Sequence, residues 1–159
     1  MGDIDFPNKI KYKKLVPEAI APYREKGNNG FDLCCVKDDQ FYPKTDKAEA
    51  SYWLGPGARH LFSTGLQIEL PEKHFAMLRP RSGLANKFGL HVLGGLIDES
   101  YRGEWKVILL NTSKENLVIK PGDKIVQFVI IKDDDYELVE ETELSETTRG
   151  EKGFGSSGT

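Results

Sequence analysis

The chain has 159 residues, a formal net charge of −3 at pH 7 and a pI near 5.7. This length predicts one domain, and the mildly acidic balance excludes a nucleic-acid coat that binds through overall charge. Hydrophobic residues make up 38% and charged residues 30%, which is typical of a globular chain and not of a disordered one.

The N-terminal region, Met1 to Leu15, is polar and rich in lysine, without the apolar segment of a secretory signal or a membrane anchor. Cys34 and Cys35 are adjacent and are the two cysteines of the chain, so the sequence supplies neither a disulfide framework nor a Cys-X-X-Cys metal site. We expect a protein that is soluble, not secreted and not bound to a membrane, located in the cytoplasm or in the nucleus or cytosol of a host.

Short apolar runs with strand-like alternation follow one another along most of the chain. The segment Ser82 to Phe88 is the one good helix candidate, with Ser82 as its N-cap. A polar stretch over 37–51 predicts a surface excursion. The predicted strands cover 10–15, 31–36, 59–70, 74–78, 91–93, 104–111, 117–120, 124–131 and 136–140. Short strands at this spacing predict an all-β sandwich or closed barrel.

The C-terminal segment, 147–159, is rich in glycine and serine. Glycines allow close approach of the backbone, serine hydroxyls donate to phosphate oxygens, and Arg149 offers a two-pronged donor, so a phosphate clamp is chemically reasonable. An unstructured Gly/Ser tail is the other interpretation. Phe154 favours a binding role, because an aromatic ring without a core to join can stack on a base.

The segment Pro80 to Ala85 gathers an arginine, a hydroxyl and free N–H groups where the short helix begins, which is typical of an anion site. An ordinary serine-capped helix explains the same residues. In Gly94 to Glu104, Asp98 lies in a glycine-rich turn and could orient a water, although an acidic hairpin remains the alternative. Asp32 either helps to hold a cation or stabilises a local turn.

Five segments in order resemble the five signature motifs of the homotrimeric dUTPases, the deoxyuridine 5′-triphosphate nucleotidohydrolases. They are Gly30-Phe31-Asp32-Leu33, Pro80 to Ala85, Gly95 to Glu104, Pro121-Gly122-Asp123-Lys124-Ile125-Val126-Gln127 and Arg149 to Gly158. Each motif alone is weak, but five in one order across most of the chain are highly specific.

The resemblance implies a dUTPase-type β-jelly-roll or barrel with one short helix after the second motif and a flexible C-terminal arm. We expect the jelly-roll domain to cover 1–146, with a surface insertion at 40–53, and the arm to cover 147–159. Three chains would build three shared active sites, each closed by an arm. The implied reaction is Mg²⁺-dependent hydrolysis of dUTP to dUMP and pyrophosphate, which limits uracil in DNA and supplies dUMP for dTMP synthesis.

By the same resemblance, Asp98 positions the water that attacks the α-phosphorus, and the Ser82 hydroxyl stabilises charge in the transition state. Tyr101 packs under the deoxyribose and excludes a 2′-hydroxyl. Asp32 holds Mg²⁺ through water. The remaining implied substrate contacts are Arg81, Ser82 and Gly83 with the α- and β-phosphates, Gly95 and Ile97 with uracil, Gln127 near the phosphates, Arg149 with the γ-phosphate, Phe154 stacked on uracil, and Gly155, Ser156 and Ser157 with phosphate oxygens.

The segment 40–53 is longer than many family members carry between the first and second motifs. It is either a tolerated surface insertion or a surface for a protein partner, because it concentrates Phe41, Tyr42, Tyr52 and Trp53. Two alternative functions follow: a regulatory protein that acts through this insertion, or a dCTP deaminase-like enzyme of the same superfamily. Arg81-Ser82-Gly83 and Tyr101 argue against the deaminase.

Overall fold

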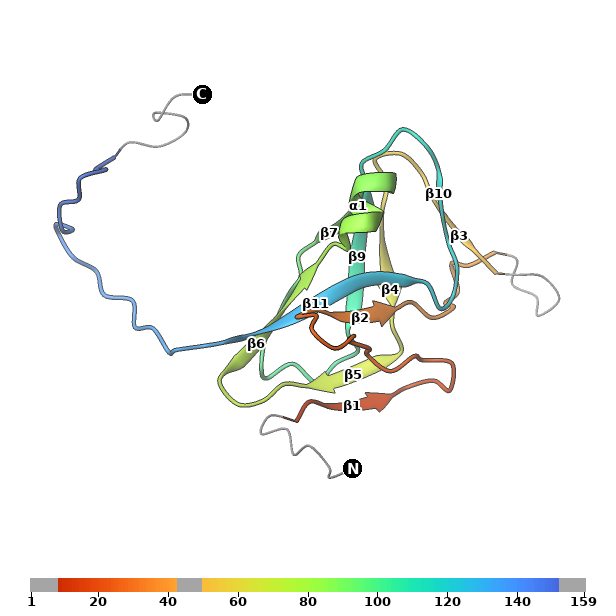
Figure 1. Ribbon diagram of the computed structural model, residues 1–159, viewed down its shortest axis with the longest axis horizontal. Helices are drawn as coiled ribbons and strands as arrows, with labels where there is room; N and C mark the ends of the chain where they lie inside the picture. Colours follow the sequence, from red (N-terminus) through yellow and green to blue (C-terminus); the bar gives the residue numbers. More distant parts are fainter. Residues whose placement is uncertain (1–8, 43–49, 152–159) are drawn as a thin grey trace.

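The computed structural model describes residues 9–42 and 50–151 and shows an all-β chain with a single short helix in this part (Figure 1). The elements are β1 (Lys11–Lys14), β2 (Phe31–Cys34), β3 (Tyr52–Leu54), β4 (Arg59–Ser63), β5 (Leu66–Glu69), β6 (His74–Arg79), α1 (Ser82–Phe88), β7 (Leu90–Leu93), β8 (Leu96–Ile97), β9 (Lys106–Asn111), β10 (Leu117–Ile119) and β11 (Lys124–Lys132).

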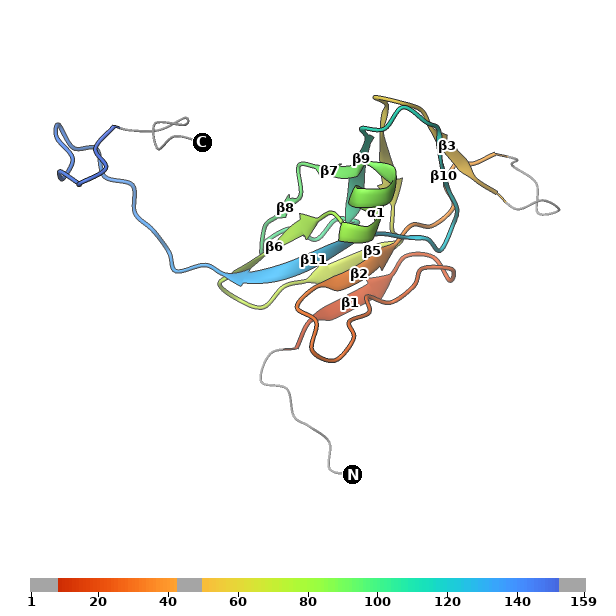
Figure 2. The same ribbon diagram turned by 45° about the horizontal axis from the view of Figure 1, so that its top comes forward.

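All strand pairs are antiparallel, and the strands form a jelly-roll-type arrangement, which confirms the predicted fold class. The largest sheet has the order β2-β11-β6-β8, and a second sheet has the order β4-β9-β7. Two-strand pairs, β1-β5 and β10-β3, complete the described strands. The long strand β11 therefore lies between β2 and β6, as the two views in Figures 1 and 2 show.

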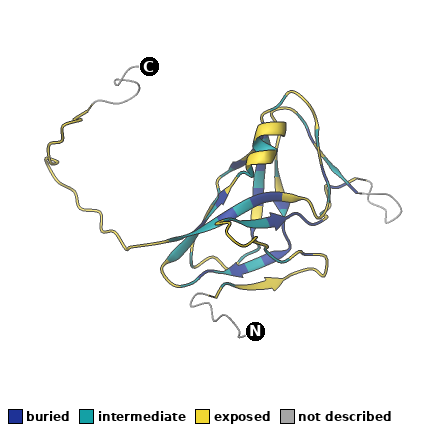
Figure 3. Ribbon diagram, viewed as in Figure 1, coloured by how far each residue is buried: buried dark blue, intermediate teal, exposed yellow. Residues whose placement is uncertain are grey.

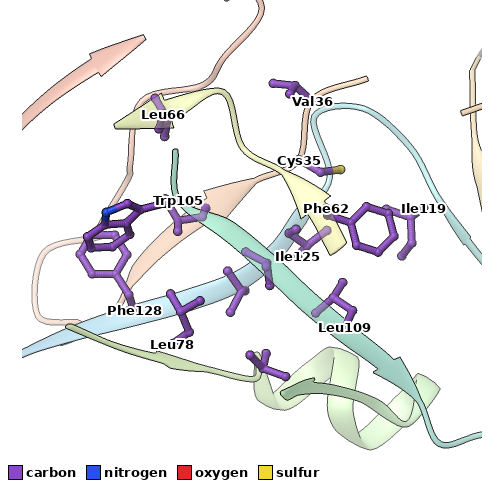
Figure 4. Packing of buried hydrophobic residues seen from close by; sticks show 14 of the residues in the cluster. Cys35, Val36, Phe62, Leu66, Leu78, Trp105, Leu109, Ile119, Ile125 and Phe128 are labelled. Atoms are coloured by element: carbon purple, nitrogen blue, oxygen red, sulfur yellow. The ribbon is translucent and has the colours of Figure 1, made fainter. Parts of the chain in front are cut away.

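The core lies between the two larger sheets, and its buried residues come from most of the strands (Figures 3 and 4). Strand β9 alternates between exposed or half-buried and fully buried positions, so that Val107 and Leu109 point inward. Trp105 and Phe128 are both fully buried and meet edge to face with ring centroids 5.1 Å apart. This packing fixes β11, the strand that the candidate site depends on.

The helix spans the predicted residues, but its N-cap is Arg81 and not Ser82, which is the first helical residue. Arg81 has extended backbone and makes no side-chain cap bond, because a guanidinium has no acceptor for a backbone N–H; it donates to Asp32 instead. Gly89 ends the helix with φ 63°, in the left-handed region where glycine carries no steric penalty.

The predicted strands differ from the structure at four points, the first of which is β3 (Tyr52–Leu54), which was not predicted because it begins inside the segment interpreted as a surface insertion. The segment 59–70 forms two strands, since Gly65 turns the chain between them with φ 67°. Strand β8 was not predicted, because its two residues are too few to show alternation. The predicted strand over 136–140 is wrong: these residues form no strand, and Leu138 is 98% exposed.

The segment 40–53 belongs partly to the core, which corrects its interpretation as a loop of exposed aromatics. Phe41 is fully buried, and the ring of Tyr52 stacks on His60 with centroids 4.0 Å apart. Tyr42 and Trp53 are exposed, and Trp53 lies on β3 opposite Val118. Residues 43–49 lie outside the described residues, so the partner surface stays a prediction.

Regular structure ends with β11 at Lys132, and residues 133–151 lead away from the sheets as an exposed segment (Figures 1 and 3). The division of the chain at residue 146 and the arm over 147–159 stay predictions. No helix in the described ranges is long and apolar enough to cross a membrane.

Candidate active site

An open cleft of about 410 Å³ lies between α1 and the paired strands β2 and β11. Five of the predicted site residues line it: Asp32, Arg81, Ser82, Gly83 and Gln127. They come from the first, second and fourth motifs, which are separated by about 45 residues or more along the chain, as expected for a site built on a rigid sheet. The structure therefore brings the phosphate-directed part of the prediction together within one chain.

Strand pairing explains this juxtaposition. Gln127 of β11 lies opposite Asp32 of β2 on one side and opposite Arg79 of β6 on the other. Because Pro80 and Arg81 follow directly after β6, the same register places the second motif beside the first and the fourth. A register shift between Lys124 and Val126 marks a bulge in β11 at the edge of the cleft.

The carboxylate of Asp32 is held by two cationic side chains. Arg81 Nε donates to Asp32 Oδ1 at 3.0 Å, and Lys124 Nζ lies 3.1 Å from Asp32 Oδ2. Arg81 also donates from Nη1 to the backbone carbonyl of Lys124 at 3.2 Å. With Lys87 and Glu25, the other charged residues of the lining, the cleft carries three cations against two carboxylates. This excess of positive charge suits the cleft to an anion.

The amide of Gln127 is held by one hydrogen bond and fits into the space that Gly30 leaves. Its Nε2 donates to the carbonyl of Pro80 at 3.0 Å. A Cβ on Gly30 would lie 2.5 Å from Gln127 Oε1, so a side chain at this position would displace the amide. Glycine at residue 30 therefore serves the placement of Gln127.

Several cleft residues were missed by sequence reasoning. Lys124 was quoted within the fourth motif without a role, and Lys87 and Tyr23 were given none. Tyr23 pairs with Asp32 through an isolated bridge, and the ring centroid of Tyr23 lies 5.0 Å from Lys124 Nζ. The signal for Lys124 was its position three residues before Gln127 on the same strand. The register places Lys124 opposite Cys34, and the structure shows that its ammonium reaches diagonally to Asp32.

Beneath the cleft, the thiols of Cys34 and Cys35 are buried. Burial raises the pKa of Cys34, and the ammonium of Lys124 opposes this shift. Burial also raises the pKa of Cys35 to about 12, with the charge of Asp123 acting in the same direction. Both thiols are therefore protonated at neutral pH, and neither acts as a nucleophile.

The third motif lies outside this cleft. Gly95 approaches Leu78 so closely that an added Cβ would lie 3.2 Å from the Leu78 carbonyl, and Ile97 pairs with Ala76 on β6. Asp98 is exposed on the following turn, and Tyr101 is 45% exposed. Neither Asp98 nor Tyr101 lines the cleft that holds Asp32 and Arg81.

The turn of Asp98 is held by bonds that sequence reasoning did not assign. Glu99 accepts a hydrogen bond from the backbone N–H of Lys73 at 2.7 Å. The Tyr101 hydroxyl donates to the carbonyl of Glu104 at 3.0 Å, and the Tyr101 N–H donates to the Asp98 carbonyl at 3.1 Å. The turn is therefore ordered although the described chain places nothing over it.

Arg149 lies in the exposed segment 133–151 and does not line the cleft. Phe154, Gly155, Ser156 and Ser157 lie outside the described residues. The structure thus places the phosphate part of the predicted site and leaves the arm contacts as predictions.

Metal binding was tested on the donor set. Among the described residues no group of three His, Cys, Asp or Glu side chains could hold a metal ion. Asp32 is the one predicted metal contact, and both of its oxygens already face cations. Direct ligation by the protein alone does not fit, whereas a contact through water to a cation that is carried by phosphate oxygens does.

The chain matches the dUTPase family model over residues 17–158. It is 44% identical over 153 residues to the deoxyuridine 5′-triphosphate nucleotidohydrolase of Wolinella succinogenes, covering 94% of both chains. It is 45% identical over 153 residues to the enzyme of the same name from Hydrogenobaculum sp., covering 94% of this chain and 98% of that one.

Solved structures give the same result. A variant of the Staphylococcus bacteriophage 80alpha dUTPase with dUpNHpp is 27% identical, with a TM-score of 0.76 and coverage of 96% of this chain and 99% of that one. A dUTPase variant from phage phi11 of S. aureus, described as coordinating a structural Mg(II) ion, is 23% identical and supports the fold alone, with a TM-score of 0.72 and coverage of 87% and 100%.

Proposed function

Since the chain belongs to the dUTPase family, we propose that it hydrolyses dUTP to dUMP and pyrophosphate, in nucleotide metabolism. The observation that carries the proposal is the cleft in which Asp32, Arg81, Ser82 and Gln127 meet. Hydrolysis of a phosphoanhydride asks the protein for positioning and charge stabilisation, and this cleft supplies cations and donors without a covalent nucleophile.

Within the cleft, Arg81 contributes a fixed guanidinium toward the phosphate chain. Ser82 and Gly83, at the start of α1, offer a hydroxyl and backbone N–H groups to the same oxygens. No side chain lies within 4 Å of the position that a Cβ on Gly83 would take, so phosphate oxygens can approach this backbone closely. Gln127 contributes its amide from the floor of the cleft.

Asp98 activates the attacking water by accepting its proton as water approaches the α-phosphorus. Tyr101 supports the deoxyribose and rejects a 2′-hydroxyl by steric exclusion, while backbone groups of Gly95 and Ile97 pair with uracil. Arg149 and the arm residues Phe154, Gly155, Ser156 and Ser157 close over the bound nucleotide.

A homotrimer explains why these groups are apart in one chain. Asp98 and Tyr101 are ordered and exposed but do not reach the cleft of their own protomer. A neighbouring copy that contributes its third motif, with an arm from the remaining copy, completes the constellation. The partners proposed for the chain are therefore dUTP, dUMP and two copies of itself.

Mg²⁺ is the proposed cofactor, held by triphosphate oxygens and, through water, by Asp32. When bound, it neutralises phosphate charge and polarises the anhydride. The chain's own contribution is to orient Asp32, whose carboxylate accepts a hydrogen bond from Arg81 Nε.

The proposal is tested by measuring pyrophosphate release from dUTP, UTP, dTTP and dCTP, with Mg²⁺ or with EDTA. We expect release from dUTP at least about 10²-fold faster than from the other nucleotides, because a filled, hydrogen-bonding pocket discriminates by that order or more. Equal rates with UTP would contradict the role of Tyr101. Release of ammonia from dCTP would favour the deaminase instead.

A further inference from the structure

Lys124 has no place in the mechanism above, although its side chain reaches the centre of the cleft. Its ammonium lies 3.1 Å from Asp32 Oδ2, on the carboxylate oxygen that Arg81 does not use. The ring of Tyr23 lies on another side, with its centroid 5.0 Å from Lys124 Nζ. In the free cleft, the Lys124 ammonium therefore lies on the Asp32 carboxylate, which is proposed to contact Mg²⁺ through water.

The two cations differ in how firmly they are held. Arg81 makes a second bond, from Nη1 to the Lys124 carbonyl at 3.2 Å, which fixes its guanidinium to the backbone of β11. Among the described residues, the Lys124 ammonium makes no second hydrogen bond that would fix it in this way, and its side chain is 42% exposed. The flexible four-carbon side chain of Lys124 can therefore move its ammonium, while the planar guanidinium of Arg81 is held in place by two hydrogen bonds.

Charge requires such a movement when a metal-bound triphosphate enters. Each Asp32 oxygen already faces one cation, so a hydrated divalent cation that arrives at Oδ2 would lie beside the Lys124 ammonium and repel it. The entering phosphates bring negative charge to the same cleft, so an ammonium that leaves Asp32 finds a new acceptor at hydrogen-bond distance.

We propose that Lys124 is a placeholder cation and a further phosphate-binding residue. Its ammonium neutralises Asp32 in the free protein and transfers to an oxygen of the phosphate chain when Asp32 turns to the hydrated divalent cation. Arg81 keeps its bond to Asp32 Oδ1 throughout. The inference rests on the proposed function only in that a polyphosphate enters this cleft.

The test is a double-mutant cycle on binding, measured by isothermal titration calorimetry. The variants are Lys124→Met, Asp32→Asn and the double variant, with Lys124→Arg as the conservative change. Lys13→Met on β1 is the matched control, because Lys13 is exposed and does not line the cleft. The probes are the non-hydrolysable dUpNHpp and inorganic tripolyphosphate, each with Mg²⁺ and with EDTA.

With EDTA, Asp32→Asn should bind either probe about tenfold more tightly than the unmodified chain, because Lys124 is released from its carboxylate. In the Lys124→Met background, Asp32→Asn should raise the affinity for either probe by about threefold or less, because Arg81 is then the one cation released from Asp32. With Mg²⁺, Lys124→Met should weaken binding by about tenfold, and Lys124→Arg should retain most of the affinity. Lys13→Met should change neither value.

A static ion pair predicts a different pattern. If Lys124 only supports Asp32 structurally, Asp32→Asn gains nothing with EDTA, or gains equally in both backgrounds, and either result overturns the proposal. Thermal unfolding of each variant identifies loss of the folded structure, and Lys124→Gln replaces Lys124→Met if that variant does not fold.

Tripolyphosphate separates this inference from the proposed function. A chain that shows the coupling with tripolyphosphate but releases no pyrophosphate from dUTP would refute the proposed substrate and retain the role of Lys124. A chain that hydrolyses dUTP but shows no coupling between Lys124 and Asp32 would support the proposed substrate and refute the role of Lys124.

Discussion

Around Asp32, Arg81 and Gln127 the chain assembles a charged cleft from three separate motifs, whereas Asp98 and Tyr101 lie on an exposed turn outside it. The first region is made by strand register, because β11 pairs with both β2 and β6. The second region is ordered by local bonds, such as that from the Lys73 N–H to Glu99. One chain therefore assembles the residues proposed to bind phosphate, and the proposed function takes the nucleoside contacts from a further chain.

The largest expected effect is on the exposed half. Asp98→Asn removes the group proposed to accept the proton of the attacking water, so kcat for dUTP should fall by about 10²- to 10⁴-fold. Binding of dUpNHpp should remain within about threefold, because the cleft around Arg81 is untouched. Pyrophosphate release and calorimetry measure the two quantities. Turnover at the original rate would show that Asp98 does not do this work.

A mixing experiment tests whether the cleft and the turn of one active site come from different chains. Arg81→Ala damages the cleft and Asp98→Asn damages the turn, so each variant alone should be nearly inactive. If each site combines the cleft of one copy with the turn of another, chains refolded together at equal amounts should leave about one site in four intact. A mixture without recovered pyrophosphate release would place both halves in a single chain.

Removal of residues 148–159 tests the proposed arm. The deletion takes away Arg149 and the predicted nucleotide contacts while leaving every described strand in place. We expect kcat/KM for dUTP to fall by about 10²-fold, because closure over the phosphates supplies positioning and excludes water. Light scattering should still report a trimer. Full activity would mean that the two halves described above suffice.

A smaller effect is expected from Gly30→Ala, which perturbs only the cleft. The new Cβ would meet Gln127 Oε1 at 2.5 Å, so the amide must leave its bond to the Pro80 carbonyl. The KM for dUTP should rise by about three- to tenfold, since one net hydrogen bond contributes roughly 1 kcal/mol. Thermal stability should change little, because the displaced atom ends a flexible side chain. A larger loss of stability than of affinity would indicate that Gly30 has a backbone role.

The elements and residues that sequence reasoning predicted share a physical reason. Helix α1 has the predicted bounds because helix-favouring residues lie between Arg81 and a glycine that can adopt positive φ. The wrong strand at 136–140 has the same alternation as real strands but no neighbouring strand in the described chain to pair with. Alternation identifies a face that could be buried, and only the partner decides whether it is.

The site shows the same limit. Asp32, Arg81 and Gln127 were identified through motifs, but the ion pair between Asp32 and Lys124 depends on the register of β2 against β11, which the sequence does not encode locally. Phe41 was assigned to a surface insertion, yet it is fully buried beside Phe62, with ring centroids 6.2 Å apart. Contacts between distant segments were the part that sequence patterns could not supply.

The last prediction concerns the stability of the fold and not its activity, and it lies at Cys35, the residue after β2. Burial raises the pKa of Cys35 from 9.0 to about 12 in the folded chain. Below pH 9 the thiol is protonated in both states, so it costs nothing. Between pH 9 and pH 12 the unfolded chain releases this proton and the folded chain does not, so the free energy of unfolding should fall as pH rises.

Urea unfolding of the unmodified chain and of Cys35→Ala at pH 8 and pH 10.5 measures this difference. Cys35→Ala should be less stable at pH 8 because it leaves a small cavity, and the difference in unfolding free energy should narrow by about 2 kcal/mol at pH 10.5. Lysine and tyrosine titrations act equally on both chains and cancel in the comparison. An unchanged difference would mean that Cys35 ionises as freely in the folded chain as in the unfolded one, and that the chain after β2 is packed less tightly than its burial indicates.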